Sequence, residues 1–378
     1  MRPVVVAPAP FKGALGAPDA AVAIGAGFRL AATGVETRLV PVADGGEGTT
    51  AALVAAADGH TRAFEVDDPL GRPVQADIGL LPGGTAVVEL AAASGYERLA
   101  AGERDPEATS TFGTGQLIRA ALDLGARRVV VAVGGSATTD GGLGLARALG
   151  VRLLDGDGGE LAGRGADLGR LATIDLAGMD PRLGDTTVEV ACDVESPFDG
   201  PEGAARVFAP QKGADAAAVE RLDAGLASVA GVYLAATGVD VRSLPGAGAA
   251  GGAAGGMAAM LGARLVPGAE LVLDAVGFDE RLDGAGLCIT GEGRLDEQSM
   301  MGKAPGAVAA RCREAEVPCV AVCGQLALLP GIVRRMGLVA AFPIRREAGT
   351  VEEALRHTET DLAAMGAALG GLVARLSG

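Results

Sequence analysis

The chain has few of the side chains on which several common kinds of active site depend. Aromatic residues make up 3% of its 378 residues, tryptophan is absent, and histidine occurs only twice. His60 and His357 adjoin no serine or cysteine motif, which disfavours histidine-dependent triads and histidine-bound zinc. No apolar run approaches the roughly 18 residues that a membrane helix needs. The available chemistry is therefore that of acids, hydroxyls, glycine loops and a few lysines.

Cysteine content and net charge indicate the cellular compartment and the class of partner. The five cysteines form no C-x-x-C pair, and several lie in apolar runs where free buried thiols are expected. The N-terminus runs directly into a strand-like segment rather than a signal peptide, so we expect a cytoplasmic, reduced protein. A net charge of −15 argues against nucleic acid or an anionic membrane as a partner. We expect a small-molecule substrate, and the sequence leaves the oligomeric state undecided.

The order of strand-like and helix-like segments predicts an α/β fold with two domains. A chain of 378 residues exceeds one ordinary core. Its first segments alternate strand and helix, as in parallel sheets, and its last part repeats that alternation. Shorter strand-like pieces begin around Val66–Val74. We therefore expect a Rossmann-like domain with a parallel sheet, built from residues 1–69 and 287–378, and an inserted mixed α/β domain from 70 to 286.

A glycine-rich loop lies near the middle of the chain. Val129–Val133 is typical of a buried strand, and the helix-like segment Leu143–Leu149 follows it. Strand, glycine loop and helix start, in this order, direct backbone N–H groups at an anion. An ordinary turn of an α/β domain is the alternative, since the G-x-x-x-x-G-K-[ST] signature is absent. The loop residues that we expect to contact phosphate are Gly134, Gly135, Ser136, Thr138, Asp140, Gly141 and Gly142.

Acidic residues follow four of the expected strands. Ligands of open α/β sheets bind outside the carboxyl ends of the strands, so these acids are expected to line a cleft. Each acid taken singly also fits a turn or a helix cap. The acids are Asp44, Asp140, Asp193 and the pair Glu292 and Asp296.

Lysine is scarce, with three lysines against 29 arginines. Each lysine lies beside a motif loop: Lys12, Lys212 and Lys303. A compact ammonium suits phosphate oxygens and differs from the planar guanidinium fork. Lys12 is the strongest functional candidate of the three, and coincidence with turn-rich positions is the alternative explanation.

Taken together, the motifs resemble those of the bacterial glycerate kinase family, of the type that makes 2-phosphoglycerate. The resemblance implies two α/β domains facing a cleft, one of them Rossmann-like. At Ala9 the chain departs from the family, which usually has aspartate there, so we expect reduced or altered binding at that position. The matching motifs run over nearly the whole chain: Ala7-Pro8, Phe11-Lys12-Gly13, Pro41 to Thr49, Val133 to Thr138, Asp140-Gly141-Gly142, Ala191 to Val194, Phe208 to Gly213, Pro245 to Gly252 and Ile289 to Arg294.

The resemblance implies an enzyme, an ATP-dependent phosphotransferase acting on an alcohol group of D-glycerate, with 2-phosphoglycerate favoured over 3-phosphoglycerate as the product. The expected cofactors are ATP and Mg²⁺. In this hypothesis Asp193 orients or deprotonates the attacking hydroxyl, and Lys12 neutralises charge on the transferred group. Glu292 and Asp296 hold magnesium. Nucleotide phosphates bind the loop from Gly134 to Gly142 and Lys303, and glycerate binds Asp44, Gly45, Gly46, Glu47 and Gly48.

Two alternatives come from other functional classes. Gly246-x-Gly248-x-x-Gly251 matches the dinucleotide pattern of a nicotinamide-dependent hydroxy-acid dehydrogenase, but Pro245 and no expected strand precede it. A non-enzymatic sugar-acid sensor is the second alternative, and no basic helix-turn-helix face is evident for it. Titration with NADH tests the first, and ATP turnover with glycerate tests the second.

Overall fold

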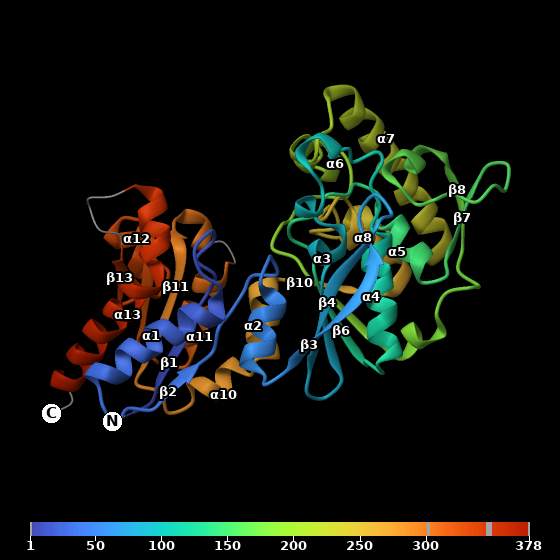
Figure 1. Ribbon diagram of the computed structural model, residues 1–378. Coiled ribbons are helices and arrows are strands. Elements are labelled where there is room, and N and C mark those ends of the chain that lie inside the picture. Colours follow the sequence, from blue (N-terminus) through green and yellow to red (C-terminus); the bar gives the residue numbers. More distant parts are fainter. Residues whose placement is uncertain (1, 301–302, 345–349, 377–378) are drawn as a thin grey trace. The chain divides into compact units, whose positions relative to one another are not determined.

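The computed structural model describes residues 2–300, 303–344 and 350–376 (Figure 1). It consists of two compact units. Unit 1 comprises Met1–Asp44, Ala51–Gly59 and Gly268–Gly378, and unit 2 comprises Gly45–Thr50 and His60–Pro267. Both units combine helices with a β-sheet, which confirms the predicted α/β class.

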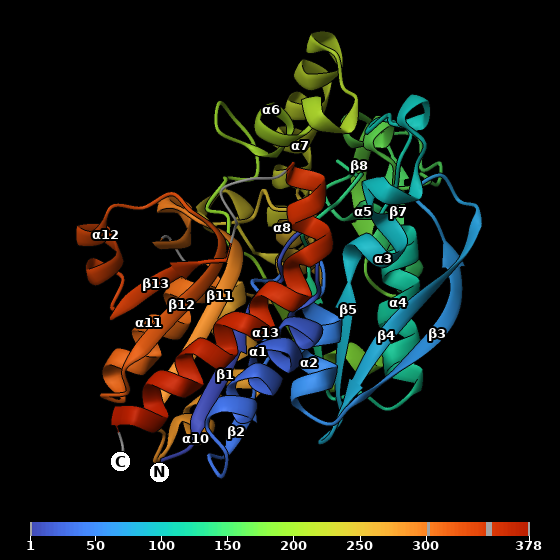
Figure 2. The same cartoon turned by 60° about the vertical axis from the view of Figure 1, so that its left-hand side comes forward.

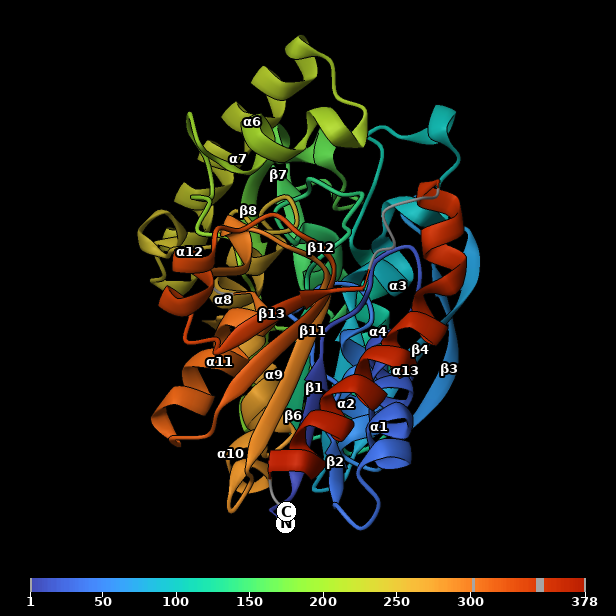
Figure 3. The same cartoon turned by 90° about the vertical axis from the view of Figure 1, so that its left-hand side faces the viewer.

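Unit 1 is built on a five-stranded sheet in which all neighbouring strands are parallel. The sheet order reverses at β1 and β11, which Figure 3 shows side by side, because the chain continues from β1 to β2 on one side and from β11 to β12 on the other. Ligands of such sheets bind outside the carboxyl ends of the strands at this reversal. In spatial order the strands are β13 (Ala340–Pro343), β12 (Cys319–Leu326), β11 (Leu287–Leu295), β1 (Val4–Pro8) and β2 (Thr37–Leu39).

Glycine allows the two longest helices of unit 1 to pack closely. Helices α1 (Ala17–Ala31) and α13 (Val351–Leu376) lie along one another (Figure 2). A Cβ atom at Gly27 would lie 1.9 Å from the carbonyl oxygen of Ala363. The other helices of this unit are α9 (Gly268–Ala275), α10 (Phe278–Leu282), α11 (Ala304–Glu314), α12 (Pro330–Arg335), the 3₁₀ turn η7 (Glu297–Met300) and α2 (Thr49–Ala56), whose first two residues belong to unit 2.

Unit 2 contains a six-stranded mixed sheet. Strands β5, β6, β9 and β10 are parallel to one another, whereas β3, β4 and β5 form an antiparallel meander. The carboxyl ends of β5, β6, β9 and β10, together with that of β3, therefore lie at one edge of the sheet. In spatial order the strands are β10 (Arg264–Val266), β9 (Thr187–Ala191), β6 (Arg128–Ala132), β5 (Thr85–Glu89), β4 (Pro73–Leu81) and β3 (His60–Asp67), and a separate hairpin consists of β7 (Arg152–Asp155) and β8 (Leu171–Asp175).

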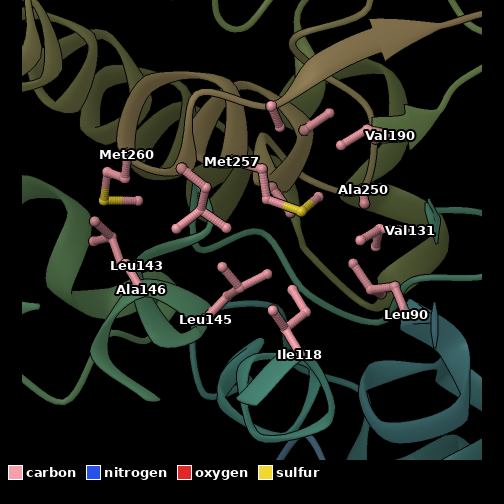
Figure 4. Packing of buried hydrophobic residues seen from close by; sticks show 14 of the residues in the cluster. Leu90, Ile118, Val131, Leu143, Leu145, Ala146, Val190, Ala250, Met257 and Met260 are labelled. Atoms are coloured by element: carbon pink, nitrogen blue, oxygen red, sulfur yellow. The ribbon is translucent and has the colours of Figure 1, made fainter. Parts of the chain in front are cut away.

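Aliphatic side chains, mainly Val, Leu and Ala, fill the core of unit 2, as the scarcity of aromatic residues requires. Met257 and Met260 of α8 pack over Leu143 and Leu145 of α5 (Figure 4). In the part of the chain that the structure describes, no helix combines the length and apolar character that crossing a membrane requires. The α-helices of unit 2 are α3 (Leu90–Ser94), α4 (Phe112–Asp123), α5 (Leu143–Ala148), α6 (Ala204–Phe208), α7 (Ala216–Thr237) and α8 (Ala253–Leu261).

The borders of the two units differ from the expected domain borders at 69 and 286. Strand β3 belongs to unit 2 because it pairs along its whole length with β4. Helices α9 and α10 belong to unit 1, where Arg311 of α11 forms ion pairs with Glu270, Asp274 and Asp279. Glu292, which was expected to follow a strand, lies inside one. Strand β11 continues through Gly291 to Leu295, and residues 204–213 contain α6 and the 3₁₀ turn η5 (Pro210–Lys212).

Candidate active site

Lys12 lies at the carboxyl end of β1, beside β11. The backbone N–H of Ala9 donates to the carbonyl of Gly291 at 2.7 Å, which carries the chain from β1 along the neighbouring strand. Lys12 follows on an exposed turn, and its backbone nitrogen lies 3.4 Å from where a Cβ of Gly293 would be. The side chain at position 9 is buried. The alanine that departs from the family pattern is thus enclosed next to the strand that carries Glu292.

Charged groups gather around Glu292 on β11. Burial raises the pKa of the Glu292 carboxyl, and a hydrogen bond from the Ser299 hydroxyl and the positive charge of Lys303 oppose this shift. The negative charges of Asp296 and Asp44 raise the same pKa, so both acids lie near Glu292. Unit 1 therefore brings together Asp44, Glu292, Asp296 and Lys303, all of which we expected at a site.

These acids fit a magnesium ion that is shared with a phosphorylated ligand. Mg²⁺ usually binds one or two carboxylates and completes its octahedral shell with water and phosphate oxygens. Glu292 and Asp296 supply two carboxylates, and Ser299 holds both segments because it accepts from the Asp296 N–H at 3.1 Å and donates to Glu292. Among the described residues, no three carboxylates come within 4.8 Å of one another. An ion bound by protein carboxylates alone therefore does not fit, whereas one completed by phosphate does.

Lys303 begins helix α11. It occupies the N-cap position, is half-buried, and is followed by Pro305 in the first turn. A cation opposes the helix dipole at that end, and the negative charge of Glu292 compensates it. That Lys303 binds nucleotide phosphate stays a prediction; Gly302, next to it, lies outside the described residues.

In unit 2, the loop Gly45–Gly48 lies against the ends of two strands. A Cβ atom at Gly45 would come within 2.9 Å of Ala191, the last residue of β9. One at Gly134, just past β6, would lie 2.8 Å from the Cα of Gly46. Only glycine permits backbones to approach this closely. The structure thus brings the expected substrate loop next to Gly134, Gly135 and the segment that carries Asp193.

Glu89 binds this loop and was not among the residues expected at the site. Glu89 is the last residue of β5, and its carboxylate accepts the backbone N–H of Thr50 at 2.7 Å. Burial raises its pKa, while the hydrogen bonds from Thr50 and the Gly48 N–H lower it. The only signal in the sequence is an acid at the end of an apolar strand, which does not reveal its distant partners.

Asp193 lies two residues beyond β9 and is exposed. Its neighbour Cys192 has a thiol pKa raised to about 11 by burial and also by the charge of Asp193. That cysteine is therefore a poor nucleophile at neutral pH. The exposed acids of this segment are Asp193 and Glu195.

The structure argues against a direct nucleotide contact for Asp140, Gly141 and Gly142. Asp140 is fully buried, and its carboxylate accepts hydrogen bonds from the N–H and hydroxyl of Thr111, both at 2.7 Å. It also accepts from the N–H groups of Gly142 at 3.0 Å and Gly144 at 3.2 Å. The backbone donors at the start of α5 are thus bound by the protein's own acid. Gly141 in turn packs under α8, where a Cβ at Gly256 would lie 2.1 Å from its carbonyl oxygen.

Lys212 donates hydrogen bonds to the same loop. Its side chain is buried, and its ammonium donates to the Ser136 hydroxyl at 2.8 Å and the Thr138 carbonyl at 2.6 Å. Burial lowers the pKa of Lys212 to about 7, and the nearby charge of Asp140 opposes this shift. Thr138 is buried too, and within the described residues its hydroxyl has no hydrogen-bond partner. The accessible part of the expected phosphate loop is therefore Gly134 and Gly135, and Ser136 beside them is buried.

The run Pro245–Gly252 packs inside unit 2 and does not form a dinucleotide site. The 3₁₀ turn η6 (Val241–Ser243) precedes it rather than a strand. A Cβ at Gly248 would lie 2.1 Å from the carbonyl oxygen of Pro197, and one at Gly251 would lie 2.1 Å from that of Thr138. These glycines allow close packing of α8 against the loops, which removes the basis of the dehydrogenase alternative.

Comparison with known proteins agrees with this arrangement of motifs. The model of the glycerate kinase family matches residues 4–374. The chain belongs to the glycerate kinase family. A glycerate 2-kinase of Escherichia coli (strain K12) is 44% identical over 354 residues, which cover 93% of each chain. A glycerate kinase of Bacillus subtilis (strain 168) is 44% identical over 355 residues, covering 94% of this chain and 93% of the relative.

A solved structure shows the same fold in the family. The crystal structure of a protein assigned as glycerate kinase 2 from Salmonella typhimurium LT2 superposes with a TM-score of 0.91 at 40% sequence identity. The match covers 100% of this chain and 99% of that chain. The resemblance inferred from the motifs is thereby confirmed, and membership of a kinase family implies ATP as the co-substrate.

Proposed function

We propose that the chain transfers the γ-phosphoryl group of ATP to D-glycerate and releases 2-phosphoglycerate in preference to 3-phosphoglycerate. The observation that carries this proposal is the position of the loop Gly45–Gly48, which lies against Ala191 at the end of β9, two residues before the exposed Asp193, and against Gly134 just past β6. Backbone N–H groups of such a loop suit a small carboxylate, and a nearby acid suits a hydroxyl. The names of the relatives support the same substrate.

In unit 2 we assign the proton transfer to Asp193. Its carboxylate would accept the hydroxyl proton of glycerate while the hydroxyl oxygen forms a bond to the γ-phosphorus, and ADP leaves with the electrons of the broken P–O bond. Gly45 to Gly48, with Asp44 before them, would bind the carboxylate of glycerate. Gly134, Gly135 and Ser136 would contact phosphate oxygens, with Lys212 fixing Ser136.

In unit 1 we assign the charged groups to the phosphates and to magnesium. Glu292 and Asp296 would hold Mg²⁺, which neutralises charge on the transferred phosphoryl group when it is bound. Lys12 and Lys303 are the cations of this unit that we assign to phosphate oxygens, because a compact ammonium suits them. These assignments keep the roles that the sequence predicts for Lys12, Lys303 and both acids.

Phosphorus NMR of the product tests the proposal. The full chain is incubated with ATP, MgCl₂ and D-glycerate. The phosphorus of 2-phosphoglycerate couples to a single proton and gives a doublet, whereas that of 3-phosphoglycerate couples to two and gives a triplet. We expect the doublet. A triplet would overturn the choice of hydroxyl, and the absence of both signals would overturn the proposed activity.

Kinetics of the variant Asp193→Asn test the assigned proton acceptor. We expect kcat to fall by about 10² or more with little change in the KM for glycerate. Glu195→Gln changes another exposed acid of the same segment and serves as the control with near-normal kcat. A normal kcat in Asp193→Asn would remove this residue from the catalytic group.

A further inference from the structure

Three buried cysteines meet in unit 1, away from the groups assigned above. Cys288 lies on β11 and Cys319 on β12, and the two are paired neighbours in the parallel register. Cys312 lies near the end of α11, the helix that connects these two strands. All three side chains are buried. The segment that runs from β11 through α11 to β12 thus brings three thiols close together.

The spacing of the sulfur atoms suits a single metal ion. All three Sγ atoms lie within 4.8 Å of one another. Metal–thiolate bonds of about 2.3 Å place three sulfurs around one ion roughly 4 Å apart. A shift of less than about an ångström per sulfur therefore converts the observed cluster into a coordinating one. Shifts of this size lie within the freedom of cysteine χ1 angles.

Burial alone does not account for this convergence, because cysteine is often buried simply as a small apolar residue. Cys323 shows that ordinary case: it lies on the same strand as Cys319 and is equally buried, yet it is not part of the cluster. Cys192 lies in unit 2. All five thiols are free, so no disulfide uses the three sulfurs. The chain therefore contains its own comparison between clustered and isolated cysteines.

We infer that Cys288, Cys312 and Cys319 form a three-thiolate site for a soft d¹⁰ metal ion, either Cu(I) or Zn²⁺. Thiolate sulfur selects these ions over hard ones such as Mg²⁺. Among the described residues, no histidine or carboxylate joins the group, so the ion receives three sulfur ligands. Structural zinc usually takes four ligands, whereas Cu(I) is satisfied by three thiolates. Each thiol that binds releases its proton to solvent.

The position of the cluster separates its role from the chemistry proposed for unit 1. Cys288 precedes Glu292 by four residues along β11, which corresponds to about 13 Å at the rise of a strand. A bound ion would join β11, β12 and α11 near the amino-terminal end of the strands, and Glu292 lies toward the other end. Binding should therefore stabilise unit 1 without requiring contact with substrate. The buried ion would enter during folding or by local opening of the segment.

Metal binding to the full-length chain tests the site. The reduced protein is unfolded in urea, refolded anaerobically with either Cu(I) or Zn²⁺, and titrated with a chromophoric chelator selective for that ion. We expect one ion per chain and a higher Tm for the loaded protein. Cys288→Ser, Cys312→Ser and Cys319→Ser should each weaken binding by more than the roughly 10- to 100-fold that loss of an outer-shell partner costs.

Cys323→Ser and Cys192→Ser are the matched controls and should bind the ion like the wild type. X-ray absorption of the loaded wild-type protein gives a readout that does not depend on folding of the variants, and it should show three sulfur neighbours at about 2.3 Å. Binding with Cu(I) alone or Zn²⁺ alone identifies the ion. The inference is overturned by binding of neither ion, by nitrogen or oxygen neighbours in place of sulfur, or by binding that survives the three cluster substitutions.

Discussion

The carboxyl groups of Asp140 in unit 2 and Glu292 in unit 1 both have a raised pKa, but different groups surround them. Burial raises the carboxyl pKa of both. Asp140 is saturated by donors from Thr111, Gly142 and Gly144. Glu292 has the hydroxyl of Ser299 on one oxygen and other charged side chains around it.

This comparison distinguishes a structural acid from an acid that can bind a ligand. A buried carboxylate whose oxygens are bound by the protein's own N–H groups has little capacity left for a phosphate-bound ion, and its removal leaves those donors unsatisfied. A half-buried carboxylate with other acids and a lysine nearby retains that capacity. A raised pKa alone does not separate the two cases, because burial causes it in both.

The largest effect is expected for Asp140→Ala. Loss of this carboxylate leaves the buried N–H groups of Thr111, Gly142 and Gly144 without a partner, and each such donor costs about 1–3 kcal/mol. We expect the free energy of unfolding to fall by about 3 kcal/mol or more, measured by urea denaturation followed by circular dichroism. Asp157→Ala, at an exposed loop position, should change it by less than about 0.5 kcal/mol. A stable Asp140→Ala protein with a raised KM for ATP would reverse the comparison.

Glu292→Gln should show the opposite pattern. We expect kcat/KM for glycerate phosphorylation to fall by about 10² or more, with a shift in the magnesium dependence, because a neutral amide binds Mg²⁺ poorly. The free energy of unfolding should change little. Glu297→Gln, an exposed neighbour, is the control for both measurements. Loss of stability with normal activity would place Glu292 in the same class as Asp140.

The ammonium of Lys212 donates to the loop that carries Asp140, and its burial predicts a dependence of stability on pH. Its pKa is about 7 in the folded chain against an ordinary 10.5. Between these values the unfolded chain binds a proton that the folded chain does not, so the free energy of unfolding gains up to about 1.4 kcal/mol per pH unit as pH rises. Below about pH 7 both states are protonated and this contribution is constant.

Lys212→Met should remove that rise, so the difference in unfolding free energy between wild type and variant should change between about pH 7 and pH 9. The exposed variant Lys12→Met is the control and should keep the wild-type slope. An identical slope in wild type and Lys212→Met would mean that Lys212 stays protonated in the folded protein.

The smallest effect is expected for Ser299→Ala. The Ser299 hydroxyl stabilises the charged form of Glu292, so its removal should raise the Glu292 pKa further. The acid limb of kcat/KM against pH should then move upward by less than about one pH unit, while the rate on the alkaline side stays the same. Ser243→Ala, on the surface of unit 2, should leave the profile unchanged. A downward shift would contradict the role assigned to Ser299.

Part of the candidate site could be predicted because its signals are local. Asp193 follows a strand after one intervening residue, and the loop after Asp44 consists largely of glycine. The scarcity of lysine drew attention to Lys212, whose buried ammonium the structure ties to Ser136. Glu89 gave no such signal, because the groups that it binds lie 39 residues earlier in the chain.

The sequence by itself determined the alternation of strands and helices, the α/β class and the order of motifs that marks the family. These properties depend on side-chain periodicity and on glycines at turns, which act over a few residues. Only the tertiary structure decided which acids are already saturated. Two of the hydrogen bonds that saturate Asp140 come from Thr111, 29 residues away, and the thiols that meet at Cys288 come from Cys312 and Cys319. Hydrogen-bond partners and converging ligands are brought together by packing, so no local pattern records them.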